Sequence, residues 1–208
     1  MTKQHTLSNS NGFAAASTVH LFTPHFREAE LMDRGMAADV ARHMVILCNM
    51  EHVSRESLQA AMTGAEVHML ESPPNLEIDQ RFHTYTQQML DLVQTILEQK
   101  ETGKALVQLV MSGQGEQRLL SGLYGFLKTA HLENPRLRVQ WIATEFEDNI
   151  DNLVQKLNES KGLAEDRVQY VHGKRMTAGW NEVAVSPEEA SIPWKDNGIY
   201  LITGGTGD

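Results

Sequence analysis

Short apolar runs alternate along most of this chain with stretches that have the spacing of helices. The apolar runs are residues 45–48, 65–70, 105–111, 137–143 and 167–171. Runs of this length are typical of buried strands, and helix-length connections between them are typical of βαβ units. Because parallel strands need crossover connections, the alternation predicts an α/β fold, a Rossmann-like three-layer sandwich with a mostly parallel sheet.

The connections between these runs carry helix signals. Ser54 can cap a short helix that reaches residue 62, and Asp148 or Asn149 can cap another that ends near residue 160. Apolar residues recur at helical spacing over 78–100, which predicts a long amphipathic helix. A further helix is predicted from residue 116 to about residue 132.

The segments at the two ends of this pattern are less regular. The Ala-rich segment 33–43 predicts a short helix, and the apolar stretch 19–26, interrupted by Pro24, predicts an edge strand or an extended arm. After Gly173 the alternation loosens, and a proline-bearing connection leads to a last apolar run at residues 199–202.

A glycine-rich turn follows this last apolar run. Glycines directly after a strand let the backbone approach a pyrophosphate, and a dinucleotide-binding fold begins in this way. The candidate cofactor-binding residues are therefore Gly204, Gly205, Thr206 and Gly207. Residues 198–208 are predicted to be the first strand and partial turn of a second Rossmann unit, whose phosphate-binding helix would follow Asp208.

The first Rossmann-like unit has no comparable loop. Residues 49–54, which follow its first apolar run, contain no glycine and include Glu51. Gly113 and Gly115 do follow a strand, but two glycines at such a junction are common in turns, and Glu116 would repel a phosphate. The sequence thus predicts a truncated unit that lacks a working cofactor loop.

Few residues suggest catalysis or metal binding. Tyr124 and Lys128 share a helix face, where a lysine could lower the pKa of a tyrosine, but we favour an amphipathic helix with Tyr124 half buried and Lys128 solvated. Cys48 lies in an apolar run, which favours a buried hydrophobe over a nucleophile. Ser121 lies inside a predicted helix and forms no nucleophile elbow. The nine histidines have no metal-ligand spacing, so we predict no catalytic residue and no metal.

Length and charge disfavour several kinds of partner. The 208 residues suit one domain better than two, and 27 acidic residues against 18 basic ones give a net charge of −9. This charge opposes binding to nucleic acid or anionic lipid. No apolar run approaches the roughly 18 residues of a membrane span, and residues 1–18 suggest a linker or leader without a signal-peptide layout. We expect a cytoplasmic protein with neither nucleic-acid nor membrane partners.

Longer motifs add a family resemblance. They are Leu21-Phe22-Thr23-Pro24, Gly122-Leu123-Tyr124-Gly125-Phe126-Leu127-Lys128-Thr129-Ala130-His131-Leu132-Glu133-Asn134-Pro135, Arg138-Val139-Gln140, Val171-His172-Gly173-Lys174-Arg175, Ala178-Gly179-Trp180 and Tyr200-Leu201-Ile202-Thr203-Gly204-Gly205-Thr206-Gly207. Over about residues 19–208 the chain resembles the structural half of ketoreductase domains in modular polyketide synthases.

The resemblance implies a domain in two parts. The first part, here residues 19–197, is a cofactor-free scaffold. The second part binds NADPH and reduces the β-ketone of an acyl chain on the phosphopantetheine arm of an acyl carrier protein. The implied partners are the catalytic subdomain in the same polypeptide, the acyl carrier protein and neighbouring domains of a multifunctional enzyme of antibiotic biosynthesis. No cofactor is implied for this chain alone, and NADPH is implied for the intact ketoreductase.

The resemblance also limits which functional residues can be assigned. The family's catalytic Ser, Tyr and Lys belong to the second part. If the helix that ends near Glu133 is aligned with that of short-chain reductases, their catalytic Tyr and Lys fall near Glu116 and Leu120 of this chain, and neither residue can replace them in catalysis. Only residues 204–207 match cofactor-contacting positions, and Asp208 stands where small residues are more usual.

Two other interpretations stay open. One is a truncated stand-alone short-chain dehydrogenase/reductase or nucleotide-binding module, against which the missing glycines after Cys48 argue. The other is a docking protein that uses an acidic α/β surface.

Overall fold

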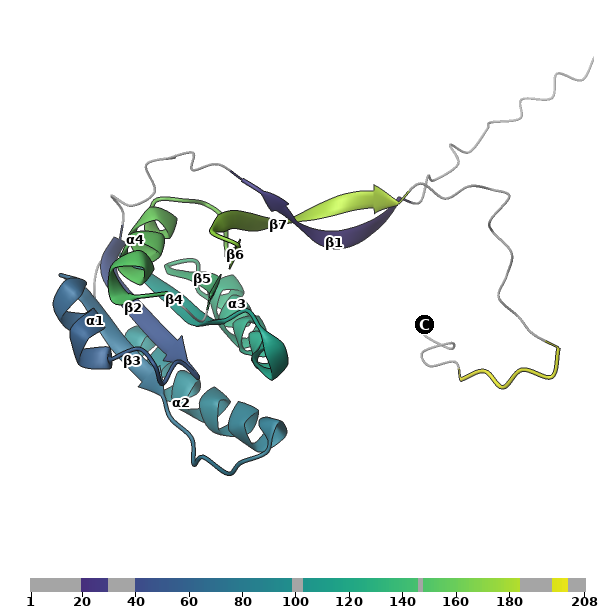
Figure 1. Ribbon diagram of the computed structural model, residues 1–208, viewed down its shortest axis with the longest axis horizontal. Coiled ribbons are helices and arrows are strands. Elements are labelled where there is room, and N and C mark those ends of the chain that lie inside the picture. The colour runs from purple at the N-terminus through teal and green to yellow at the C-terminus, as the bar shows by residue number, and fades with distance from the viewer. Residues whose placement is uncertain (1–19, 30–39, 99–102, 146–147, 184–195, 202–208) are drawn as a thin grey trace, which may run out of the picture. The chain divides into compact units, whose positions relative to one another are not determined.

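Strands and helices alternate through the chain (Figure 1). The structure is a computed structural model that describes residues 20–29, 40–98, 103–145, 148–183 and 196–201. In these residues one seven-stranded sheet has the order β1-β7-β6-β5-β4-β2-β3. The strands are β1 (Leu21–Glu28), β2 (Val40–Cys48), β3 (Ala65–Leu70), β4 (Lys104–Ser112), β5 (Leu137–Thr144), β6 (Arg167–Val171) and β7 (Lys174–Val183).

The central strands of the sheet are parallel. β2 pairs in parallel with β3 and β4, β4 with β5, and β5 with β6, whereas β6 and β7 are antiparallel. The connections contain α1 (Arg55–Ala61), α2 (Ile78–Glu98), the 3-10 helix η2 (Gly115–Gly122), α3 (Leu123–Glu133) and α4 (Ile150–Lys161). The predicted α/β fold with a mostly parallel, Rossmann-like sheet is confirmed.

Helices cover both faces of the parallel strands. On β2, Met44 and Ile46 pack in the cluster that includes α2 and α3, while Val45 and Leu47 pack in the cluster that includes α1 and α4. Successive side chains of a strand point to opposite faces, so both faces of β2 are buried. A strand buried on both faces is apolar throughout, which explains the continuous apolar runs in the sequence.

The chain divides into two compact units. One unit consists of residues Pro24–Gly179 and contains β2 to β6 with the helices named above. The other unit consists of Met1–Thr23 and Trp180–Asp208. Its described residues are the outer ends of β1 and β7 and residues 196–201.

The predicted helix caps are present at two helices. The Ser54 hydroxyl accepts a hydrogen bond from the Ser57 N–H at 3.2 Å, and the Asn149 side chain accepts one from the Asn152 N–H at 2.8 Å. Of the two residues that could cap α4, Asn149 is therefore the cap. Asp148 binds Lys156 Nζ instead, with oxygen distances of 2.7 and 2.6 Å.

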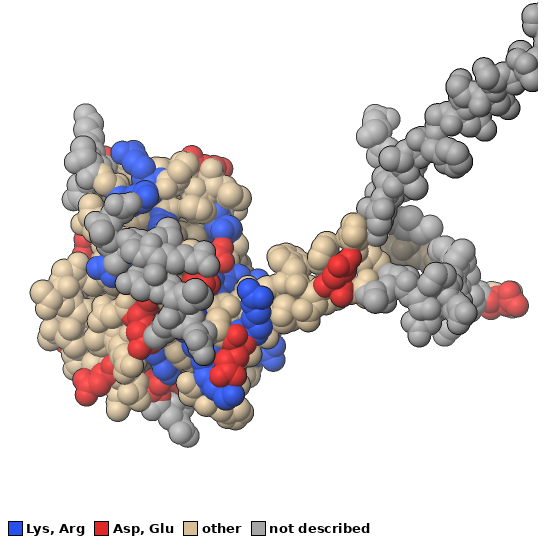
Figure 2. All heavy atoms as spheres, turned by 90° about the horizontal axis from the view of Figure 1, so that it is seen from above, with Lys and Arg blue, Asp and Glu red and all other residues tan. Residues whose placement is uncertain are grey.

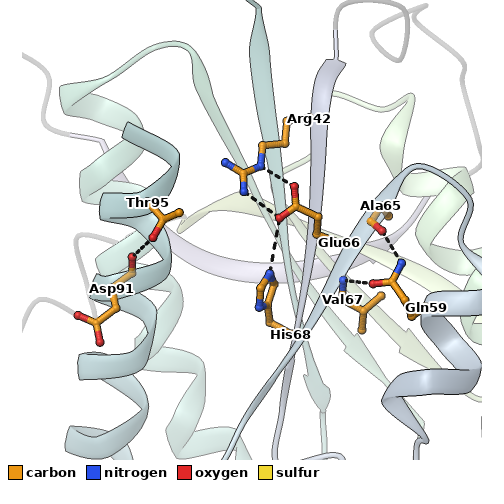
Figure 3. A network of polar contacts seen from close by, with 8 residues as sticks. All are labelled: Arg42, Gln59, Ala65, Glu66, Val67, His68, Asp91 and Thr95. Carbon is orange, nitrogen blue, oxygen red and sulfur yellow. Dashed lines mark hydrogen bonds and ion pairs between the residues drawn. The ribbon is translucent and has the colours of Figure 1, made fainter. Parts of the chain in front are cut away.

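Side chains also complete the edge of the sheet at β3, as Figure 3 shows. Gln59 of α1 donates from Nε2 to the Ala65 carbonyl at 2.7 Å, and its Oε1 accepts from the Val67 N–H at 2.8 Å. These bonds satisfy backbone groups that an edge strand would otherwise present to another chain. Arg42 and Glu66 join β2 to β3 through two bonds of 2.8 Å.

Three features differ from the sequence-based expectations. The helix predicted over 33–43 is wrong for residues 40–43, which belong to β2 because they pair with β3 and β4, and residues 33–39 lie outside the described part. The helix predicted from residue 116 begins as the 3-10 helix η2 and becomes α-helical at Leu123. After β6, His172 and Gly173 both have positive φ, which makes a two-residue turn into the antiparallel strand β7.

Candidate functional site

The carboxyl ends of parallel strands are where Rossmann-like folds bind nucleotides. In this chain the corresponding region is formed by the residues that follow β2, β4 and β5, together with the starts of α2 and η2. The side chains there decide whether a dinucleotide can bind to the first unit.

Side chains fill the turn after β2. Met50 is buried, and Asn49 adopts a positive φ of 53°. Two residues of α2 hold the Asn49 side chain: Arg81 Nη1 donates to its Oδ1 at 3.3 Å, and the Tyr85 hydroxyl donates to the same oxygen at 3.4 Å. A pyrophosphate could approach this backbone only by displacing these side chains.

In the turn after β4, side chains fill the space beside the first glycine. A Cβ placed on Gly113 would lie 3.3 Å from both Ala143 Cβ and Gln169 Nε2, so side chains from β5 and β6 already occupy the space beside this glycine. Gly115, with a φ of 59°, begins η2, and Glu116 lies in its first turn. The sequence showed the two glycines, but only the fold brings Gln169 against the first of them.

The charge at this edge also opposes an anionic cofactor. Arg81 is the cation that reaches the turn, and its Nη2 lies 3.0 Å from Glu116 Oε2. A carboxylate therefore already neutralises the guanidinium that could otherwise attract a phosphate. At this edge the space beside Gly113 is occupied and Arg81 is ion-paired, whereas a Cβ placed on Gly115 would meet no atom within 4 Å.

Tyr124 and Lys128 are not arranged as a proton-donating pair. Lys128 Nζ binds Asp166 Oδ2 at 2.6 Å, so this lysine is ion-paired where we expected it to be solvated. Tyr124 is buried where we expected it to be half buried. Burial, aided by the Asp166 carboxylate, raises the pKa of Tyr124 well above its ordinary value. A phenol with a raised pKa is a poor acid at neutral pH.

The remaining candidates are placed as follows. Cys48 is fully buried, and burial raises the pKa of its thiol to about 12, as expected of a packed hydrophobe. Among the described residues no three His, Cys, Asp or Glu side chains lie together as metal ligands. None of the described helices is both long enough and apolar enough to cross a membrane. Residues 204–207 lie outside the described residues.

The smaller unit exposes several large apolar side chains. Phe22 of β1 and Trp180 of β7 are 53% and 70% exposed and line a hollow of about 350 Å³. Ile199 and Leu201 are even more exposed, at 101% and 92%. The sequence signals for this surface were the apolar arm that contains Phe22, the motif that contains Trp180 and the apolar run at residues 199–202.

No protein-family model matches the chain. Among curated proteins, 187 of its residues, 90% of the chain, are 40% identical to polyketide synthase PksN of Bacillus subtilis (strain 168). A second relative, polyketide synthase PksL of the same organism, is 31% identical over 201 residues, 96% of the chain. These matches span only 3% and 4% of the two synthases.

Among solved structures, the fold matches the crystal structure of a ketoreductase domain from the bacillaene assembly line, with a TM-score of 0.66 and 24% sequence identity. The match covers 80% of this chain and 39% of that domain. From these relationships we conclude that the chain is homologous to a segment of the Bacillus polyketide synthases PksN and PksL and has the fold of part of a polyketide synthase ketoreductase domain.

Proposed function

We propose that residues 19–197 form a non-catalytic structural subdomain that supports the NADPH-dependent ketoreductase of a cytoplasmic modular polyketide synthase. In this proposal residues 198–208 begin the catalytic subdomain of the same polypeptide. Gly204, Gly205, Thr206 and Gly207 then contact NADPH only in the intact domain. The catalytic subdomain reduces the β-keto group of a polyketide carried by an acyl carrier protein.

The filled turn after β2, at the carboxyl edge of the first unit, is the observation that carries this proposal. The strand order and helix layers are those of a nucleotide-binding fold, yet the turn after β2 holds Met50 and Asn49 instead of glycines. Arg81, the nearby cation, is already bound to Glu116. A scaffold that keeps the Rossmann-like core but closes its cofactor edge supplies packing without chemistry.

The extent of the structural match supports the same division of labour. The chain aligns with 39% of the solved ketoreductase domain, so more than half of that domain lies outside the match. We assign cofactor binding and reduction to that remaining part. The alternative, a truncated stand-alone short-chain reductase, would require the first unit to hold the cofactor itself.

The exposed apolar side chains of the smaller unit suggest how the support is given. Phe22 and Trp180 present aromatic surface to solvent, and burying one such side chain stabilises a contact by about 1.5–3 kcal/mol. We infer that they contact the catalytic subdomain in the intact ketoreductase.

The proposal is tested in the intact ketoreductase by two sets of substitutions. Glu116→Gln and Gln169→Ala change the carboxyl edge, and should leave kcat and the KM for NADPH within about twofold, since this edge holds no cofactor. Phe22→Ser and Trp180→Ser remove the apolar contact, and should lower the melting temperature of the whole domain by about 4 °C or more.

A matched control is Leu132→Ser in α3, because Leu132 is also an exposed large apolar residue, at 71%. This substitution should change neither activity nor melting temperature. If the carboxyl-edge variants instead raised the KM for NADPH tenfold without unfolding, the first unit would hold the cofactor and the proposal would be wrong.

A further inference from the structure

Strands β6 and β7 are buried on one face of the sheet and open on the other. On β6, Val168 and Tyr170 are buried in the cluster that includes α1 and α4. On β7, Thr177 and Arg175, which pair with these two residues, are buried as well. Residues that lie opposite each other in an antiparallel pair share one face of the sheet, so this face of β6 and β7 is covered.

The side chains between these buried residues point to the other face of the sheet. Among them are Arg167, Val171, Met176 and Ala178, and Phe26 of β1 lies beside Arg167. Val171 and Ala178 are exposed, and the other three are half-buried. We call these five residues the open face, and all of them belong to the larger unit. Helices cover both faces of β2, so the open face lacks a layer that the centre of the sheet has.

Arg167 supplies the positive charge of the open face. Its guanidinium carbon lies 5.5 Å from the centre of the Phe26 ring and 5.7 Å from the centre of the Trp141 ring. Trp141, which pairs with Arg167 across β5 and β6, is buried. The two rings attract the guanidinium and hold it in place. A side chain that is already held loses little entropy when it binds a partner.

Arg167 has no carboxylate partner among the described residues. On the face of the molecule that Figure 2 shows, Lys and Arg atoms lie side by side with Asp and Glu atoms. Lys174, for example, binds Glu28 at 2.8 Å. Arg167 contacts the two aromatic rings but forms no ion pair within the described part of the chain. The carboxylate next to it in sequence, Asp166, binds Lys128 instead, at 2.6 Å.

We propose that the open face docks the catalytic subdomain of the same ketoreductase and that a carboxylate of that subdomain pairs with Arg167. The inference rests on the proposed function, which gives this chain that partner. Arginine suits an interface ion pair because its planar donors match the two oxygens of a carboxylate. Apolar side chains of the same face, such as Phe26 and Met176, exclude water from the pair once the surface is covered.

Two observations favour this occupant over a second copy of the chain. The structural match leaves more than half of the solved ketoreductase domain outside this chain, which is enough protein to supply the absent layer. A symmetric contact between two copies would bring two Arg167 side chains together, and like charges repel. The carboxylate on the same side of β1, that of Glu28, already binds Lys174 and is not available to separate them.

Cysteine labelling tests whether the open face is covered. Ala178→Cys places a thiol on the open face, and the natural Cys48 is fully buried. The variant is made in the 208-residue chain and in the intact ketoreductase, and peptide mass spectrometry follows maleimide labelling at residue 178. We expect labelling to be about tenfold or more slower in the intact domain, because the core of an interface excludes solvent and reagent. The matched control is Leu132→Cys in α3, at a residue that is 71% exposed, which should be labelled equally fast in both proteins.

A cross-link tests the ion pair. Arg167→Lys keeps the positive charge and supplies an amine that a carbodiimide couples to a carboxylate in contact with it. In the intact ketoreductase, residue 167 should be joined to an Asp or Glu outside the 208 residues of this chain. Arg136→Lys, at an exposed arginine just before β5, is the control and should give no such cross-link. Circular dichroism melts check that all variants stay folded.

Three results would overturn the proposal. One is equal labelling of Ala178→Cys in the two proteins. Another is slow labelling of the 208-residue chain that becomes faster on dilution, because a second copy would then cover the face. The third is a cross-link from residue 167 only to carboxylates of this chain, or none at all. None of these measurements uses activity, so they can fail while the carboxyl-edge variants keep their KM for NADPH and the proposed function stands.

Discussion

His43 Nε2 and Gln108 Oε1 lie 2.7 Å apart inside the sheet, on the neighbouring strands β2 and β4. The Gln108 amide nitrogen donates to Gln140 Oε1 at 2.9 Å and to the Leu157 carbonyl at 3.0 Å. The Gln108 oxygen is therefore an acceptor, and His43 must donate from Nε2. This chain of side chains links three strands to α4 through buried hydrogen bonds.

The first prediction concerns pH. Burial, with Lys161 and Arg138 nearby, lowers the pKa of His43 below the ordinary value of 6.5, so the folded protein keeps the imidazole neutral. Above pH 6.5 the unfolded chain is also neutral and nothing is lost. As the pH falls below 6.5 the unfolded chain takes up the proton first, so folding is weakened. A loss of about 1 kcal/mol would lower the melting temperature by about 2–4 °C.

The measurement is the melting temperature of His43→Gln and of the unchanged chain at pH 7.5 and pH 5.5. A glutamine can still donate to Gln108 but does not titrate, so its melting temperature should fall less on acidification. The comparison is with His68→Gln. Burial also lowers the pKa of His68, but this side chain is only partly buried, so its replacement should reduce the acid-induced fall in melting temperature less than His43→Gln does. Equal losses in the His43 variant and the unchanged chain would contradict the prediction.

The second prediction concerns Gln140, the end of this chain of buried bonds. Its amide nitrogen donates to the carbonyls of Ser160 at 2.8 Å, Glu165 at 3.0 Å and Leu163 at 3.2 Å. Gln140→Leu leaves these buried acceptors without that donor and should lower the free energy of unfolding by about 2–4 kcal/mol in urea titrations.

Gln155→Leu is the control for Gln140→Leu. Gln155 lies on α4 and bonds to Glu159 at an exposed site, at 2.8 Å. Its replacement should change the free energy of unfolding by less than about 0.5 kcal/mol. Similar effects of the two substitutions would show that the buried bonds of Gln140 contribute no special stability.

The third prediction is that the 208-residue chain does not bind NADPH with useful affinity. The turn after β2 is filled by Met50 and Asn49, and Gln169 packs beside Gly113 after β4. Fluorescence and calorimetric titrations should show no saturable binding, whereas the intact ketoreductase, as a positive control, should bind. A micromolar dissociation constant for the chain alone would overturn this prediction.

The fourth prediction is that Tyr124→Phe leaves ketoreduction in the intact domain within about twofold of its original rate. Tyr124 is buried in the cluster of α2 and α3, and burial raises its pKa, so its hydroxyl is not available as an acid. NADPH oxidation with a β-keto thioester measures the effect, and a melt checks the fold. A thousandfold fall in turnover without unfolding would show that Tyr124 takes part in catalysis.

The fifth prediction concerns the segment 198–208. Of its described residues, Ile199 and Leu201 are almost fully exposed, so we expect the deletion to remove few native contacts. The deletion should improve solubility, since exposed apolar strands favour association, and should change the melting temperature by less than about 2 °C. A fall of about 10 °C would mean several kcal/mol of lost contacts and would show that this segment belongs to the first sheet.

Local patterns predicted most of the secondary structure. The runs 65–70 and 167–171 coincide with β3 and β6, and the caps at Ser54 and Asn149 are present. These signals lie within a few residues of one another, so they are visible in the sequence. The start of β2 was missed, because residues 40–43 are strand through distant pairing, such as Val40 with Lys104 and His43 with Ala65.

The candidate site was predictable in part. The absence of glycine from residues 49–54 and the carboxylate of Glu116 were sequence facts, and they predicted a first unit without a cofactor loop. The contacts that close the edge were not predictable. Arg81 binds Glu116 across 35 positions of sequence, and Gln169 reaches Gly113 from two strands away in the sheet.

The sequence by itself determined the layer architecture, since hydrophobic periodicity fixes which residues must be buried and helix caps fix where elements begin. It also predicted, through the lack of glycines after β2, a first unit without a working cofactor loop. Only the tertiary structure decided which side chains fill that edge and that Arg167 lies over the rings of Phe26 and Trp141. Such convergence depends on strand order and register, which bring distant residues together and leave no trace in any short stretch of sequence.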